Sequence, residues 1–168
     1  MKAAGVVLAT VIALALQTTL GRFIRGGTVV DLVLVVVVYA ALSLGPVTGL
    51  MAGTFAGLLQ DRLSSGVVGV GGLAKTVVGF LVGIIGTQFI VARPLPRFVV
   101  FFVASAVHAL LFIGTYELLG LRDFGYPFGQ VAAQAVGNAL IGLVAFKVGE
   151  MIPGAVERRG GAGPRLRR

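Results

Sequence analysis

Residues 29 to 60 read VVDLVLVVVVYAALSLGPVTGLMAGTFAGLLQ, an apolar run that the pair Gly45-Pro46 divides in the middle. Proline removes a backbone donor and disfavours the helical conformation in the residue before it. Because a helix rises ~1.5 Å per residue, each half would be only about 21 Å long, which is short for a membrane span. Two arrangements follow: one long helix that kinks at Pro46, or two short helices that form a hairpin there. The hairpin brings Asp31 and Asp61 to the same end, whereas the kinked helix separates them.

Apolar runs of this kind fill most of the chain. Of its 168 residues, 57% are hydrophobic and 12% are charged, and the mean hydropathy is +1.02. A soluble domain would be about 25% charged, and each transmembrane helix needs roughly 20 apolar residues. The sequence therefore predicts an all-α integral membrane protein, a bundle of about six transmembrane helices with a short second and third helix. Besides the divided run, the apolar segments cover residues 3–20, 67–92, 98–119 and 128–146.

The chain is predicted to consist of an apolar membrane domain and a basic tail. Residues 1–152 are predicted to form the six-helix transmembrane domain, and residues 153–168 a basic, disordered cytoplasmic tail. The first apolar run has the features of a signal peptide, but we favour an uncleaved helix because five further apolar segments follow it. The net charge of +8 comes largely from the tail, which holds five of the 14 basic residues. It therefore indicates membrane topology, and no nucleic-acid partner is predicted.

The basic residues also predict the orientation of the chain. With the hairpin and with both termini in the cytoplasm, nine basic residues fall on the inner side and four on the outer side, in keeping with the positive-inside rule. The nine are Lys2, Arg93, Arg97, Lys147, Arg158, Arg159, Arg165, Arg167 and Arg168. The four are Arg22, Arg25, Arg62 and Arg122.

A column of glycines follows the Gly-Pro pair. Gly45, Gly49, Gly53 and Gly57 recur at every fourth residue, and Asp61 continues the spacing one turn later. Residues four apart share one face of a helix. In lipid, small residues on one face let another helix approach closely. The column is predicted to pack within this chain or, as the alternative, to form an interface with a partner.

A lysine stands inside the next apolar run. Lys75 is followed at the same four-residue spacing by Gly79 and Gly83. A charge inside a membrane segment predicts a functional or paired site. If the third and fourth helices form a hairpin, Asp61 and Lys75 lie near the same end and can pair. The alternative is that the lysine only extends to the membrane interface.

Polar side chains recur in the last two apolar runs. Gln130, Gln134 and Asn138 form a stripe whose amides are predicted to bond to neighbouring helices or, alternatively, to face a partner or a polar cavity. Ser105 and His108 lie about one turn apart, but no orienting acid or GxSxG motif accompanies them, so an intramembrane hydrolase is not favoured.

Other single residues carry less information. Asp31 is predicted to cap the helix that it opens. The chain has no cysteine, one histidine and six carboxylates. Since the carboxylates are scattered along the sequence, we predict no metal site, no cofactor and no catalytic residue.

Four segments in the first half of the chain resemble the rod shape-determining MreD family. Four elements recur in that family in a fixed order. They are an apolar helix opened by Asp, a Gly-Pro turn, a glycine-spaced helix with an acidic end before Ser-Gly, and a helix that contains a lysine. The resemblance covers roughly residues 30 to 85. The segments are DLVLVVVVY at 31–39, LGPVTG at 44–49, GLLQDRLSSG at 57–66 and LAKTVVG at 73–79.

This resemblance implies a multi-pass protein of the bacterial cytoplasmic (inner) membrane. It implies a non-enzymatic scaffold that binds the bitopic membrane protein MreC and indirectly supports MreB, RodA and a penicillin-binding transpeptidase in peptidoglycan synthesis. Self-association is left open. The family is also similar in fold to the substrate-binding subunits of energy-coupling vitamin transporters. The alternative is therefore a small-solute-binding transporter subunit, with a polar pocket lined by Lys75, Gln130, Gln134 and Asn138.

Overall fold

The computed structural model describes residues 2–23, 30–64, 66–89, 91, 93–122, 124–125 and 127–151. Within these ranges the chain forms six α-helices, so the predicted all-α class is confirmed. The second helix is short, as predicted, with 13 residues, but the third has 18 and is nearly as long as the fourth, which has 19. The predicted tail, residues 153–168, lies outside the described residues. The helices are α1 (Lys2–Phe23), α2 (Leu32–Leu44), α3 (Pro46–Leu63), α4 (Val70–Gln88), α5 (Pro94–Leu118) and α6 (Phe128–Met151).

Gly45 makes the turn between α2 and α3. Its φ of 94° lies in the left-handed region that glycine favours, and its N–H donates to the carbonyl of Ala41 at 2.9 Å. Pro46 follows at the first position of α3, where a missing N–H costs little. α2 packs against α3, and Asp31 and Asp61 line the same cavity at one end of the bundle. The hairpin is therefore confirmed, and the single kinked helix is wrong.

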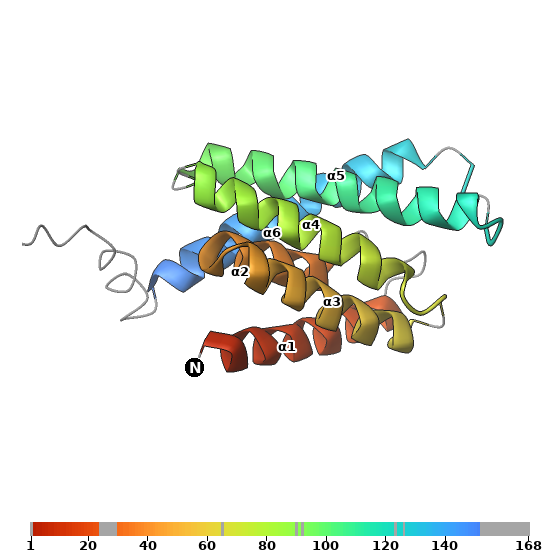
Figure 1. Cartoon of the computed structure of the whole chain (residues 1–168), viewed down its shortest axis with the longest axis horizontal. Helices are drawn as coiled ribbons and strands as arrows, with labels where there is room; N and C mark the ends of the chain where they lie inside the picture. Colours follow the sequence, from red (N-terminus) through yellow and green to blue (C-terminus); the bar gives the residue numbers. More distant parts are fainter. Residues whose placement is uncertain are drawn as a thin grey trace, which may run out of the picture.

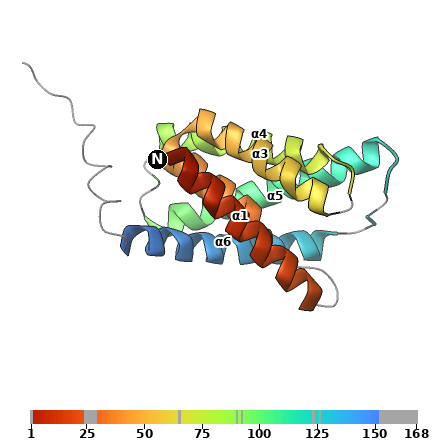
Figure 2. The same cartoon turned by 90° about the horizontal axis from the view of Figure 1, so that it is seen from below.

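Successive helices run in opposite directions along the bundle (Figure 1). The start of α1 and the end of α6 consequently lie at the same end of the molecule. α3 packs most extensively against α4, and α5 packs against both α4 and α6. α1 crosses the other helices obliquely on the outside of the bundle (Figure 2) and contacts only α2 and α3 among the helices.

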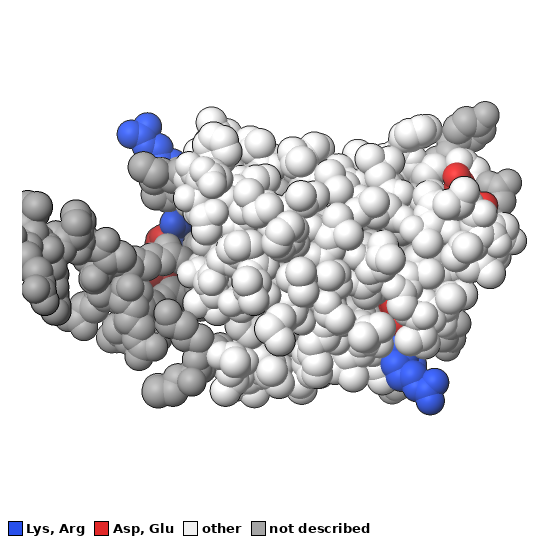
Figure 3. Space-filling view, viewed as in Figure 1, with Lys and Arg blue, Asp and Glu red and all other residues white. Residues whose placement is uncertain are grey.

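The outer surface is suited to lipid. Four helical segments are long and apolar enough to cross a membrane, namely Ala3–Gly21 within α1, and α4, α5 and α6. α2 is apolar but has only 13 residues. On the face shown in Figure 3, charged side chains lie toward the two ends and the middle carries none. The chain is therefore a multi-pass membrane protein.

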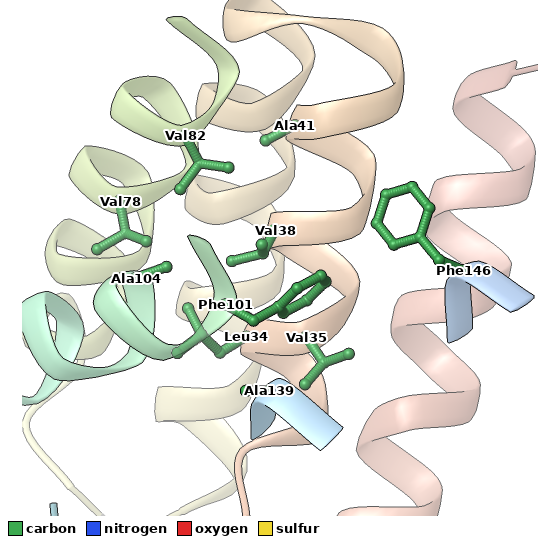
Figure 4. Packing of buried hydrophobic residues seen from close by; sticks show 10 residues of the cluster. All are labelled: Leu34, Val35, Val38, Ala41, Val78, Val82, Phe101, Ala104, Ala139 and Phe146. Carbon is green, nitrogen blue, oxygen red and sulfur yellow. The ribbon is translucent and has the colours of Figure 1, made fainter. Parts of the chain in front are cut away.

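α2 lies at the centre of the packing and is apolar around its whole circumference, as expected for a buried helix. Val33 and Val37 face α1 and α3 in one apolar cluster, together with Ala52 and Ala56. The opposite side of α2 belongs to a second cluster, which joins it to α4, α5 and α6 (Figure 4). Its ten residues are Leu34, Val35, Val38, Ala41, Val78, Val82, Phe101, Ala104, Ala139 and Phe146.

Candidate functional site

A buried ion pair joins α2 to α4. The ammonium Nζ of Lys75 lies 2.7 Å from Oδ2 of Asp31, and the two side chains are only 3% and 5% exposed. The other oxygen of Asp31, Oδ1, accepts a hydrogen bond from the N–H of Leu34 at 3.0 Å. The prediction that Asp31 caps its helix is therefore confirmed. The same carboxylate also neutralises the lysine, a role that the sequence analysis did not assign to it.

Lys75 has a second buried partner on α5. Its Nζ lies 3.1 Å from Nε2 of His108, the single histidine of the chain. The imidazole stacks on Phe112, with ring centroids 6.1 Å apart. Its other nitrogen, Nδ1, is buried and has no hydrogen-bond partner among the residues that the structure describes. Such an unpaired buried polar atom costs about 1–3 kcal/mol, so it needs an explanation.

Asn138 extends this polar network to α6. Its side chain is fully buried. Its carbonyl Oδ1 accepts the backbone N–H of Asp31 at 2.9 Å, and its Nδ2 donates to Oγ of Ser105 at 3.0 Å. Asn138 therefore serves the internal packing, one of the two roles predicted for the polar stripe. Since Ser105 bonds to Asn138 and His108 bonds to Lys75, the serine and the histidine do not form a catalytic pair.

Asp61 does not pair with Lys75, so that interpretation is wrong. Its Oδ2 accepts the N–H of Gly69 at 2.8 Å and the N–H of Gly72 at 3.0 Å. The helix α4 begins at Val70, so Asp61 meets the free amides of its first turn. Lys75 lies more than a turn deeper, level with Asp31. The alternative that Lys75 extends to the membrane interface is also wrong, because its side chain is buried.

The glycine column is used within the fold. A Cβ placed on Gly49 would overlap the backbone carbonyl of Gly79, and one on Gly53 would overlap that of Lys75. A Cβ on Gly57 would come 2.5 Å from Cα of Gly72. These glycines therefore allow α3 and α4 to touch backbone to backbone, as the internal interpretation predicted. Gly83 makes the same kind of contact with Pro46, whereas a Cβ on Gly45, at the turn, would meet no atom within 4 Å.

A cavity of about 440 Å³ opens at the end of the bundle that is remote from the start of α1 and the end of α6. The starts of α2, α4 and α6 and the ends of α3 and α5 meet there, because successive helices run in opposite directions. Asp31, Lys75 and His108 form part of its wall, and Asp61 lies beside them. Of the predicted polar stripe, Gln130 and Gln134 line the cavity and Asn138 does not.

Gln60 has a second unsatisfied polar atom. It lies one residue before Asp61 and lines the same cavity. Its Oε1 is buried and accepts no hydrogen bond from the described part of the chain. Gln60 on α3 and His108 on α5 therefore each have one buried polar atom whose hydrogen-bonding capacity is unused among the described residues, and each atom is covered by the surrounding protein.

Aromatic rings form another part of the wall, near the mouth. Phe112 and Tyr116 have ring centroids 4.8 Å apart, and Phe124 packs edge-on against Tyr116 at 5.9 Å. The hydroxyl of Tyr116 accepts the N–H of Val67 at 3.0 Å, which ties the loop before α4 to α5. Arg122 lies over the ring of Phe124 at 4.9 Å. Contacts between α5, the loop before α4 and the residues that follow α5 thus stabilise this part of the wall.

Charged residues at the opposite end hold α5 and α6 together. Arg97 forms an ion pair with Glu150 at 2.7 Å and lies 4.3 Å from the ring centroid of Phe146. Its Nε also donates to the carbonyl of Val91 at 3.2 Å. The buried polar atoms without a partner in the described ranges belong to Gln60 and His108, not to these residues, so the candidate site is the cavity at the other end.

Residues with acidic or metal-binding side chains do not gather into a candidate metal site in the part of the chain that the structure describes.

Sequence reasoning assigned no role in this cavity to His108, Gln60 or Tyr116. The sequence signal for His108 was weak: it is an ionisable residue within a membrane segment, and such residues often indicate function. Only the packing of α5 beside α4 brings His108 to Lys75.

The chain matches the model of a known protein family over most of its length. The family model described as rod shape-determining protein MreD matches residues 2–144. No curated protein and no solved structure matches the chain.

Proposed function

The chain belongs to the MreD family of rod shape-determining proteins, and on this premise we propose that it is a non-enzymatic scaffold that binds MreC at the cavity. Through MreC, a bitopic membrane protein, it supports the machinery that contains MreB, RodA and a penicillin-binding transpeptidase. It acts in the bacterial cytoplasmic membrane with both termini in the cytoplasm. The cavity then opens toward the outer side, where peptidoglycan is made.

The observation that carries this proposal is the cavity itself, whose wall combines the polar side chains of Gln130 and Gln134 with the aromatic rings of Phe112 and Tyr116. Binding sites commonly join an apolar or aromatic wall with a few polar groups that orient the bound partner. The cavity volume lies within the range typical of binding sites, about 300–1,000 Å³.

The glycine column does not supply the partner surface. Gly49, Gly53 and Gly57 already contact the backbone of α4, so a helix of another protein cannot approach them without separating α3 from α4. The proposed surface for MreC lies instead at the ends of the helices that surround the cavity.

A substitution at the mouth of the cavity tests this proposal. Gln130 is exposed and lines the cavity, whereas Val136 is 42% exposed on the same helix and lies outside the lining. We expect Gln130→Trp to lower co-purification of MreC from detergent at least tenfold, because the indole fills the mouth. Val136→Trp, the matched control, should retain MreC. Equal retention by both variants, each monodisperse, would exclude the cavity as the binding site.

A second candidate function has one observation in its favour. Lys75, Gln130 and Gln134 line a single cavity. They are three of the four residues that the small-solute transporter alternative names, and the fourth, Asn138, does not line it. Mass spectrometry of small molecules released from the purified protein distinguishes the two. A stoichiometric metabolite whose retention is lost in Gln130→Trp would support the transporter subunit. Its absence, together with stable binding of MreC, would support the scaffold.

A further inference from the structure

Two helices border the cavity without packing against each other. α1 contributes Gln17 to the wall, and α6 contributes Gln130, Val131 and Gln134. Among the helices, α1 contacts only α2 and α3, whereas α6 contacts α2 and α5. The last turns of α1 also project beyond the outline of the other helices (Figure 2). The side of the cavity between α1 and α6, which we call the α1–α6 seam, is therefore not closed by packing between these two helices.

The glutamines at the seam lie within the membrane-spanning part of each helix. In α1 the apolar segment ends at Gly21, so Gln17 lies ~6 Å before that end at ~1.5 Å per residue. In α6, roughly 20 residues counted back from the exposed Lys147 reach Phe128. Gln134 then lies ~9 Å inside the span. The two amides are therefore at similar depths below the end at which the cavity opens.

The amide of Gln134 is accessible. In the described ranges, the buried side-chain atoms without a hydrogen-bond partner belong to Gln60 and His108. Gln134 likewise forms no hydrogen bond with the described residues, but its atoms are not among the covered ones, so a neighbouring molecule can reach them. Oε1 of Gln17 accepts the N–H of Val33 at 3.3 Å, and its amide nitrogen donates to no described residue.

Lipid alone does not satisfy such groups, because acyl chains offer neither donors nor acceptors. Polar side chains within a membrane span therefore face a polar cavity or another helix. At the seam, the lateral boundary of the cavity is formed by whatever lies beside α1 and α6 in the membrane. A transmembrane helix with a polar side chain at this depth would close the boundary and bond to the amides.

We infer that the α1–α6 seam receives the transmembrane helix of MreC, which presents a polar side chain to Gln17 and Gln134. This inference rests on the proposed function, in which MreC binds at the cavity. Because MreC is bitopic, its chain crosses the bilayer once before it reaches the outer side. A helix in the seam leads directly to the mouth of the cavity, so one partner covers both surfaces without a break.

The absence of cysteine from the chain makes this inference testable by cross-linking. Leu20→Cys lies about one turn after Gln17 on α1, and Val131→Cys lies in the cavity wall on α6. Leu73→Cys is the matched control, since it is 55% exposed near the same end of α4 and lies outside the cavity lining. Each full-length variant is purified, labelled with a maleimide–diazirine cross-linker, reconstituted with full-length MreC in lipid vesicles and then irradiated.

We expect both seam variants to cross-link to peptides of the MreC transmembrane helix, with yields at least fivefold above that of Leu73→Cys. Cross-links from Val131→Cys that fall only on the extracytoplasmic part of MreC would overturn the seam and leave the cavity as the binding site. Equal yields from Leu73→Cys, cross-links to a second copy of this chain in place of MreC, or none from either seam variant would also overturn it. Failure of MreC to co-purify with the wild-type protein would instead overturn the proposed function.

The polar contact is tested separately at Gln134. Gln134→Leu removes the amide, and we expect it to lower retention of MreC about three- to tenfold, because interhelical hydrogen bonds in membranes are individually weak. Gln134→Asn keeps an amide and should retain more MreC than the leucine variant. Val136→Leu, on the same helix and outside the lining, should bind as the wild type does. Equal retention by Gln134→Leu and the wild type would overturn the polar contact at the seam.

Discussion

The carboxylate of Asp31 and the ammonium of Lys75 form a buried ion pair at 2.7 Å, between the start of α2 and the second turn of α4. The backbone N–H of Asp31 is in turn bonded to Asn138 on α6, and Lys75 contacts His108 on α5. Four helices therefore meet at one polar centre beside the cavity. Together with the hydrogen bond from the N–H of Val33 to Oε1 of Gln17 on α1 at 3.3 Å, this centre helps to determine how α2 is placed along its axis.

Removing one member of the pair should harm the protein more than removing both charges. Asp31→Asn leaves a buried ammonium, and Lys75→Met leaves a buried carboxylate, each at a cost of about 3–5 kcal/mol. Asparagine still caps the helix, so the double variant mainly loses the charges. We expect it to unfold at a higher temperature in detergent than either single variant. Losses that simply add up would show that the two residues do not interact.

A methyl group on the glycine column should separate α3 from α4. In Gly53→Ala, the new Cβ would overlap the backbone carbonyl of Lys75, and overpacking of this kind costs about 1–3 kcal/mol. Gly114→Ala on α5 is the matched control, since a Cβ there meets no atom within 4 Å. We expect loss of monodisperse protein in size-exclusion chromatography only for Gly53→Ala. Intact Gly53→Ala protein that no longer retains MreC would instead assign the column to a partner interface.

Local patterns predicted most of the fold. The Gly-Pro pair predicted the break between α2 and α3, and the four-residue spacing of glycine predicted a close helix contact. The position of Asp31 before an apolar run predicted its role as a cap. Each of these depends on residues that are neighbours along the chain or along one helix.

The candidate site was harder to predict because it depends on the depth of residues in the bundle. The hairpin places two carboxylates, Asp31 and Asp61, at the end where Lys75 lies, and the sequence does not distinguish between them. The apolar run that contains Lys75 extends back to residue 67, but α4 begins only at Val70. The carboxylate of Asp61 therefore accepts hydrogen bonds from the amides at the start of α4 instead of pairing with Lys75. The role of His108 depends on packing between helices and has no sequence motif.

The orientation in the membrane can be tested with reporter fusions. Because the described helices alternate in direction, the start of α1 and the end of α6 lie at the same end of the bundle. The excess of basic residues at this end predicts that it is cytoplasmic. A reporter that is active only outside the cytoplasm should be silent after residue 168 and active near Arg62 and near residue 123. Activity of the fusion after residue 168 would contradict the proposed orientation.

The last prediction concerns Asp61, whose Oδ2 accepts two amides at the start of α4. Asp61→Ala leaves both amides without this acceptor, and loss of such a cap costs about 0.5–2 kcal/mol. Asp61→Asn keeps an oxygen that can accept, so it should cost less than the alanine variant. Thermal unfolding in detergent measures both.

The control is Glu117→Ala, since Glu117 is an exposed carboxylate at the end of α5, and it should leave the unfolding temperature unchanged. Asp61→Ala should also lower retention of MreC, because Asp61 holds the first turn of α4, which leads to Lys75 in the cavity wall. Asp61→Asn should retain MreC better than Asp61→Ala. If asparagine and alanine are equally damaging, the negative charge of Asp61, and not its ability to accept hydrogen bonds, is what the site requires.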